Sequence, residues 1–122
     1  MGKFDDLPDE RRRGLERMEQ VYGFDMTDGA GDFFGYTADH LFADIWSRPG
    51  LSLGVKSLAM IAMMAAANRP AELRVHLKGA LKNGCTPEEV REVLLLVALY
   101  CGIPAANEAH RAAMDVLAEE KT

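Results

Sequence analysis

The sequence is short of the residues that build disulfide frameworks and metal centres. Its 122 residues include two cysteines and three histidines. Cys85 and Cys101 lack C-x-x-C spacing, and no His-x-x-x-His or Glu-x-x-His pair occurs. Two thiols are too few for the disulfide framework of a small secreted domain, and isolated histidines do not make a zinc site. We therefore expect no bound metal, reduced thiols and a cytoplasmic location.

A basic surplus and a long apolar run are also missing. The chain has 14 Lys and Arg against 19 Asp and Glu, a formal net charge of -5, whereas nucleic-acid-binding domains normally present a basic face. The longest apolar runs, 58–67 and 93–101, have ten and nine residues, well short of the roughly 20 that cross a membrane. The first residues turn acidic at once, unlike a secretory signal. We expect neither nucleic acid nor membrane as a partner.

Helix-forming residues and helix boundaries dominate what is present. Strand-like alternation is absent, and Ala, Leu, Met, Glu, Lys and Arg prevail. The clearest boundary is Thr86-Pro87-Glu88-Glu89, where Thr86 can cap a helix, Pro87 suits its first position and Glu89 completes a capping box. The boundaries predict helices over 8–22, 32–47, 53–67, 70–83, 87–100 and about 103–119. Six helices with short connections predict one all-α domain over residues 1–122, a helical bundle.

Two of these helices are apolar nearly all the way round. Residues 53–67 are polar only at Lys56 and Ser57, and the helix over 87–100 reads VLLLVAL after its charged first turn. A helix that is apolar all round must be buried all round, but a monomer of this length leaves about a third of its unfolded-chain surface exposed. Burying one leftover Leu or Met stabilises by about 1.5–3 kcal/mol. We therefore expect an obligate homo-oligomer.

His76 is the best candidate for acid–base chemistry. It borders an inward apolar stripe, and Glu72 precedes it by one helical turn, so it could titrate near neutral pH. Glu92 lies just before an apolar run, where a half-buried carboxylate would have a perturbed pKa. For both residues a structural role and a functional role remain open, and the residues alone indicate no reaction.

Thiol chemistry is a second candidate. Cys85 precedes the Thr86 cap, close to a helix N-terminus, where a thiolate would be stabilised. Cys101 lies at the other end of that helix, about 20 Å away, which is too far for a disulfide. Two incidental thiols are the simpler interpretation, and a thiol-dependent antioxidant is the alternative.

The order of short motifs resembles one known family. The motifs are IWSRPGL at 45–51, KSL at 56–58, ELRVHLKGALKNG at 72–84, TPEEVREVL at 86–94 and YCGIPAA at 100–106. Together they resemble the γ-carboxymuconolactone decarboxylase family, within the wider carboxymuconolactone decarboxylase and alkyl hydroperoxidase D-like superfamily. The resemblance covers nearly the whole chain. It implies the alkyl hydroperoxidase D-like all-α fold and a ring-like homo-oligomer, a hexamer or a trimer.

The superfamily's peroxidase branch carries C-x-x-C-x-x-x-H, and its histidine aligns with His76. The two thiol positions are Arg69 and Glu72 in this chain, so disulfide-based peroxide reduction has no thiols there. The resemblance therefore implies the decarboxylase branch, which converts γ-carboxymuconolactone to the 3-oxoadipate enol-lactone in aromatic (protocatechuate) catabolism. Lys56 replaces the family's usual arginine and loses bidentate carboxylate recognition. A related decarboxylase acting on another lactone or keto acid is therefore an alternative.

The implied reaction needs no cofactor, because the substrate is its own electron sink. As CO2 leaves, the electrons flow through the ring double bond to the lactone carbonyl, and the dienolate is then protonated at carbon. The protein must supply carboxylate-binding groups, a donor to the developing oxyanion and an acid. We assign His76 as the proton donor and Glu92 as the group that orients it or holds its charge. The candidates for binding the small lactone carboxylate are Trp46, Arg48, Lys56 and Tyr100.

Overall fold

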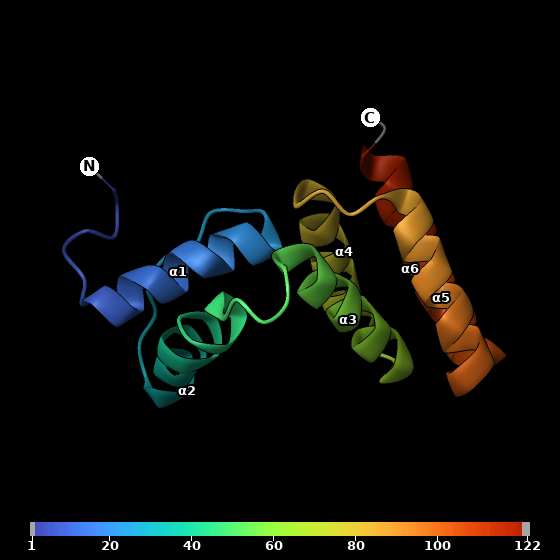
Figure 1. The fold of residues 1–122 in the computed structure, drawn as a ribbon, viewed down its shortest axis with the longest axis horizontal. Coiled ribbons are helices and arrows are strands. Elements are labelled where there is room, and N and C mark those ends of the chain that lie inside the picture. The colour runs from blue at the N-terminus through green and yellow to red at the C-terminus, as the bar shows by residue number, and fades with distance from the viewer. Residues whose placement is uncertain (1, 121–122) are drawn as a thin grey trace.

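The computed structural model describes residues 2–120, and every regular element in that range is a helix (Figure 1). The elements are α1 (Asp9–Tyr22), α2 (Asp32–Tyr36), the π-helical turn η1 (Thr37–Phe42), the 3-10 turn η2 (Ile45–Ser47), α3 (Leu53–Ala66), α4 (Pro70–Lys82), α5 (Pro87–Cys101) and α6 (Ile103–Glu120). The all-α prediction is confirmed. The expected domain also includes residues 1 and 121–122, which lie outside the described part of the chain.

Local side-chain chemistry sets the helix ends. The capping box at α5 is complete: the Thr86 hydroxyl accepts from the Glu89 N–H at 3.1 Å, and the Glu89 carboxylate accepts from the Thr86 N–H at 2.8 Å. Ser52 caps α3 by accepting from the Val55 N–H at 3.2 Å. Gly23 ends α1 with a φ of 79°, in the left-handed region that favours glycine. These boundaries agree with the sequence prediction.

The segment predicted as one helix over 32–47 is instead α2, a π turn and a 3-10 turn. The Ala43 N–H donates to the Ala38 carbonyl at 3.0 Å, five residues back, which widens the helix. Ala38 also lies against α1, because a Cβ on Gly14 would be 1.9 Å from the Ala38 carbonyl oxygen. The close backbone contact and the widened turn change the register, so this stretch does not continue as a regular α-helix. Single π turns of this kind occur frequently at functional sites.

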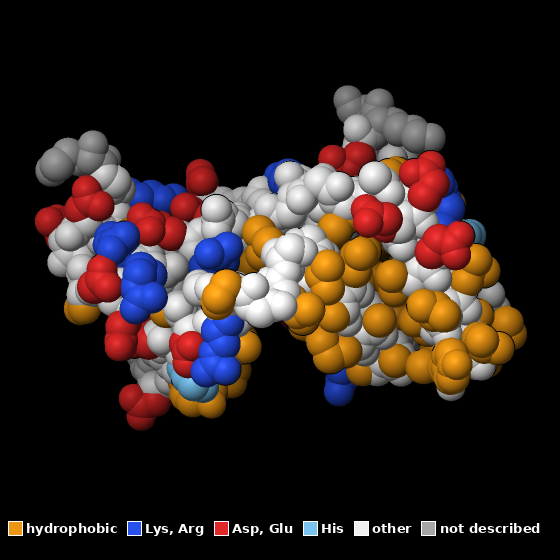
Figure 2. All heavy atoms as spheres, in the orientation of Figure 1, with side chains coloured by type: hydrophobic (Ala, Val, Ile, Leu, Met, Phe, Trp, Pro, Cys, Tyr) orange, Lys and Arg blue, Asp and Glu red, His pale blue; other side chains and the backbone are white. Residues whose placement is uncertain are grey.

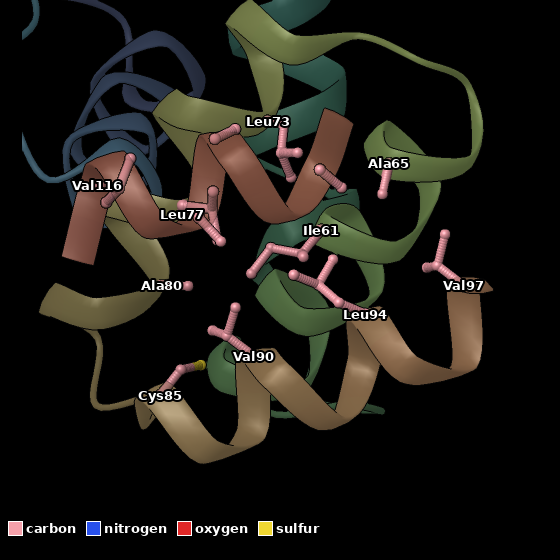
Figure 3. Packing of buried hydrophobic residues seen from close by; sticks show 13 residues of the cluster. Ile61, Ala65, Leu73, Leu77, Ala80, Cys85, Val90, Leu94, Val97 and Val116 are labelled. Carbon is pink, nitrogen blue, oxygen red and sulfur yellow. The ribbon is translucent and has the colours of Figure 1, made fainter. Parts of the chain in front are cut away.

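Two apolar clusters share the interior. Helices α3 to α6 enclose the bundle core, whose side chains point toward one another between the helices (Figure 3). A second group, the aromatic cluster, is formed by Phe4, Leu15, Met18, Val21, Ala38, Phe42 and Trp46. It lies beside the bundle, between α1 and the turn that follows α2 (Figure 1). Helix α4 joins the two, because it packs against α1 as well as against α3 and α6.

The outer faces of α3 and α5 are apolar and exposed. Leu95, Leu99 and Tyr100 on α5 are 64%, 74% and 81% exposed, and Val55 and Met63 on α3 are about half exposed. Figure 2 shows apolar side chains gathered over this part of the molecule, whereas charged side chains cover the part built by α1. The burial all round that was expected for these helices is therefore not reached within one chain. Among residues 2–120, no helix has the length and the apolar content that crossing a membrane requires.

We expect Gly14→Ala to destabilise the fold, because the new methyl group would overlap the Ala38 carbonyl, which belongs to rigid backbone. Urea unfolding should show a loss of about 1–3 kcal/mol in the free energy of unfolding. The matched control is Gly50→Ala, whose Cβ would meet no atom within 4 Å. Equal stability of the two variants would contradict the close contact between α1 and η1.

Candidate functional site

His76 lies where the bundle core meets the aromatic cluster. Its neighbours on α4, Leu73 and Leu77, face the bundle core. Its own ring stacks on Trp46, with centroids 6.3 Å apart and an interplanar angle of 6°, and it meets Tyr22 at 5.4 Å. The residue is only 4% exposed. The imidazole is therefore held between two aromatic rings, one from α1 and one from η2.

The Nδ1 atom of His76 is buried and has no hydrogen-bond partner among residues 2–120. A buried polar group without a partner costs about 1–3 kcal/mol, and folded proteins contain few of them. Groups of this kind often serve catalysis or ligand binding rather than stability. The absence of a hydrogen-bond partner for this nitrogen within residues 2–120 indicates His76 as a candidate functional residue, which is also what the sequence predicted.

Ser57 is the second buried polar group without a partner in the described chain. It lies on α3 and is 1% exposed. Leu53 and Met60, which share its helix face by spacing, pack against the aromatic cluster that contains Trp46. Sequence reasoning did not select Ser57. The available signal was its position as one of two polar residues in an otherwise apolar helix.

Burial lowers the pKa of His76 from the ordinary value of 6.5, because removal from water disfavours the charged imidazolium. The Glu72 carboxylate, one helical turn away, opposes this shift. The neutral imidazole therefore prevails at pH 7, whereas the sequence suggested titration near neutral pH.

The acidic neighbour of His76 is Glu72, not Glu92. Glu92 lies exposed on α5, and no hydrogen bond or ion pair of its side chain is found within residues 2–120. Helix α5 packs mainly against α3 and α6, and the carboxylate that acts on the His76 pKa is that of Glu72. The expected pairing of His76 with Glu92 does not form within one chain.

Lys56 is tied to the backbone. Its ammonium donates to the carbonyl oxygens of Ile45, Trp46 and Arg48 at 3.2, 3.0 and 2.7 Å. An ammonium has three N–H bonds, so these carbonyls account for all of them. In the isolated chain Lys56 fixes the turn that carries Trp46 to α3, and it is not free to bind a carboxylate.

The other predicted binding residues fall into two groups. Trp46 is buried and forms one wall of the His76 site, with its other face stacked on Phe42 at 5.9 Å. Arg48 is exposed and pairs with Asp44 through contacts of 3.0 and 3.2 Å. Tyr100 is exposed on the apolar face of α5. The structure thus places the Trp46 ring against His76 and binds Lys56 to the Trp46 backbone, and it leaves Arg48, Glu92 and Tyr100 on the surface.

The two cysteines are free, and Cys85 is not activated. Burial and the Glu89 carboxylate raise the pKa of its thiol, and its sulfur lies 3.5 Å from the Gly54 carbonyl oxygen. The thiolate stabilisation expected from the nearby helix N-terminus is therefore outweighed. Cys101 is exposed at the end of α5.

A prominent groove of the described chain lies away from His76. It is a groove of about 760 Å³, open to solvent, between α1 and the α2–η1 segment. The Arg11–Asp39 ion pair, with Nε and Oδ1 2.7 Å apart, crosses it. We place the candidate site at His76 and not at this groove, because the buried polar groups without partners in the described chain are at His76 and Ser57.

Comparison with known proteins gives matches over most of the chain. The model of the carboxymuconolactone decarboxylase family matches residues 31–115. The chain is 36% identical over 120 residues to 4-carboxymuconolactone decarboxylase from Acinetobacter baylyi, covering 90% of each protein. It is also 40% identical over 65 residues to nitrosuccinic acid decarboxylase from Metarhizium robertsii, covering 53% of this chain and 46% of that protein.

We expect His76 to make stability depend on pH. Its folded-state pKa lies below 6.5, so between these values the unfolded chain binds a proton that the folded chain does not. The free energy of unfolding that depends on a neutral His76 is therefore fully present above pH 6.5, and it decreases as the pH falls below that value. Urea unfolding at pH 7.5 and 5.5 should show a larger loss for the wild type than for His76→Gln. The exposed His110 offers the control, since His110→Gln should behave as the wild type. A wild-type loss equal to that of His76→Gln would contradict the lowered pKa.

Proposed function

The chain belongs to the carboxymuconolactone decarboxylase family, and we propose that it decarboxylates γ-carboxymuconolactone to the 3-oxoadipate enol-lactone without a cofactor, in protocatechuate catabolism. The family resemblance read from the sequence is thereby confirmed, and the chain is a carboxy-lyase. The observation that carries the proposed site is the buried His76, whose Nδ1 has no partner within residues 2–120. We also propose a cytoplasmic location, in which the two free thiols stay reduced.

In the proposed reaction the bond between the ring carbon and the departing carboxylate breaks, and CO2 leaves. The electron pair moves through the ring double bond, so that the lactone carbonyl oxygen becomes an oxyanion. A proton then adds at carbon and restores the lactone. Trp46 and Tyr22 wall the imidazole of His76 and keep water from it. Enclosure by these walls strengthens the electrostatic contacts made by the remaining polar groups.

The proposed proton donor is His76. In the free chain its imidazole is mainly neutral at pH 7, because burial lowers its pKa. A substrate that carries carboxylates raises the pKa of a neighbouring imidazole, since the negative charge favours the imidazolium. The proton that His76 takes up on binding is then the one delivered to carbon. Glu72, one turn away, also favours the charged form.

We propose that other copies of the chain complete the site. The substrate needs a cationic anchor, but Lys56 is engaged by three carbonyls, and Arg48 lies exposed. Glu92 and Tyr100 are also exposed, on the helix that carries much of the apolar surface. A ring-like homo-oligomer, a hexamer or a trimer, would bury this surface and bring the three exposed candidates to a neighbour's site.

A second substrate class has one specific observation in its favour. The chain shares 40% identity over 65 residues with nitrosuccinic acid decarboxylase, whose named substrate is not a lactone. A nitro group can accept the electron pair of a departing carboxylate, as an unsaturated lactone can. A related acid with a built-in electron sink is therefore the alternative substrate.

We expect the purified chain to consume γ-carboxymuconolactone, with loss of ultraviolet absorbance and release of CO2, without any added cofactor. His76→Gln should lower kcat roughly 100-fold or more, the usual contribution of a positioned acid. His110→Gln should retain wild-type activity. Because the protonated imidazole is the active form, kcat/KM should fall as pH rises above the free-chain pKa of His76, which is below 6.5. An inactive wild type would contradict the function, and full activity of His76→Gln would contradict the site.

We expect the wild type to behave as a homo-oligomer in light scattering coupled to size-exclusion chromatography. Leu99→Glu places a charge in the middle of the apolar surface and should shift the protein to smaller species. The exposed Gln20 on α1 lies away from that surface, so Gln20→Glu is the control. A monomeric wild type would contradict the proposed assembly.

A further inference from the structure

Ser57 is a buried polar group that the proposed reaction has not yet used. We propose that its hydroxyl contacts the substrate and donates a hydrogen bond to an anionic oxygen of the lactone acid bound beside His76. This inference rests on the proposed function, because it assigns a further contact in the same site. It is carried by the burial of Ser57, by its lack of a partner and by the helix face on which it lies.

Some other hydroxyls of the described chain donate to a backbone carbonyl, and the hydroxyl of Ser57 does not. A serine or threonine inside a helix commonly donates to the carbonyl four residues earlier. Thr37 does this, at 2.9 Å from the Phe33 carbonyl oxygen. Ser47 donates to the Phe42 carbonyl at 2.8 Å. Within residues 2–120 the Ser57 hydroxyl makes no such bond, although the residue is only 1% exposed.

Packing does not require a hydroxyl at this position. Alanine recurs along α3, and Ala65 fills a buried position of the same helix. An alanine at 57 would occupy nearly the same volume and leave no polar atom without a partner. The hydroxyl therefore weakens the isolated fold, and its benefit must come from a group that the folded chain does not itself supply.

Ser57 faces the side of the bundle on which His76 lies. Leu53 and Met60, four residues before and three after it, pack against the aromatic cluster. Its neighbour Lys56 donates to the Trp46 carbonyl at 3.0 Å, and the Trp46 ring stacks on His76. The two unpartnered polar atoms, on α3 and α4, thus lie along one boundary between packed helices. A ligand that enters this boundary meets a hydroxyl from one helix and an imidazole from the other.

The lactone acid has two kinds of oxygen that can accept a hydrogen bond from this hydroxyl. The loss of one bond changes KM and the loss of the other changes kcat, so kinetic measurements distinguish the two. A bond to a carboxylate that persists unchanged through the reaction is uniform binding, and its loss raises KM. A bond to the lactone carbonyl strengthens as negative charge develops, and its loss lowers kcat. Either change supports contact with the substrate.

The test compares Ser57→Ala with Ser52→Ala, which removes the capping hydroxyl of the same helix. For Ser57→Ala we expect a Tm equal to or above that of the wild type and a kcat/KM at least tenfold lower. For Ser52→Ala we expect a lower Tm and an unchanged kcat/KM. Ser57→Cys keeps the volume, has a much weaker donor and should also lose activity. Wild-type kcat/KM in both Ser57 variants would overturn the proposal, as would a loss of Tm in Ser57→Ala as large as that in Ser52→Ala.

A binding measurement separates this inference from the proposed function. Muconolactone, which lacks the departing carboxylate, should raise the Tm of the wild type but not that of Ser57→Ala. If the wild type shows no turnover and this difference persists, the proposed function fails and the Ser57 contact stands. If the wild type turns over and Ser57→Ala matches it in turnover and in binding, the contact fails and the function stands. An absence of both turnover and binding in the wild type overturns both.

Discussion

The packing of His76 between Trp46, on which it stacks, and the tilted ring of Tyr22 is the contact on which the rest of the structure depends. It lies where two apolar clusters meet, one inside the four-helix bundle and one beside it. Aromatic faces exclude water and offer no strong hydrogen-bond acceptor. The imidazole therefore lies in surroundings where its neutral form is favoured and its Nδ1 has no partner within the described chain. The contact at which the clusters meet also sets the chemical state of the histidine.

Much of the polar chemistry around this contact serves to hold its parts in place. Lys56 uses its charge on three backbone carbonyls and so fixes the turn on which Trp46 lies. Arg48, on the same turn, is paired with Asp44. Among the buried side-chain groups of residues 2–120, those left without a hydrogen-bond partner are the His76 Nδ1 and the Ser57 hydroxyl. The proposed site relies on this division, in which the supporting residues are satisfied by the fold and the two proposed ligand-binding groups are not.

The outer faces of α3 and α5 are apolar and exposed to solvent. Leu99 and Tyr100 are more exposed than large apolar side chains usually are in a monomer, and they lie on the helix that also carries Glu92. An exposed apolar face of this kind is suited to burial against an identical neighbour, as in the proposed assembly. The family to which the chain belongs performs decarboxylation, in which exclusion of water strengthens each electrostatic contact.

The sequence by itself determined most of the helix boundaries, and it indicated His76 as a candidate site residue. The Thr86–Glu89 capping box, the Ser52 cap and the Gly23 terminus depend on residues within a few positions of one another, so their outcome could be predicted without the fold. The tertiary structure decided what depends on distant contacts. The approach of Ala38 to Gly14 accompanies the π turn in place of a regular helix. Helix α5 packs mainly against α3 and α6 and leaves Glu92 exposed and unpaired with His76, and the position of the Trp46 turn gave Lys56 three carbonyls to bind. Local signals act through the neighbouring backbone, whereas the partner of a side chain is settled only when the helices have packed.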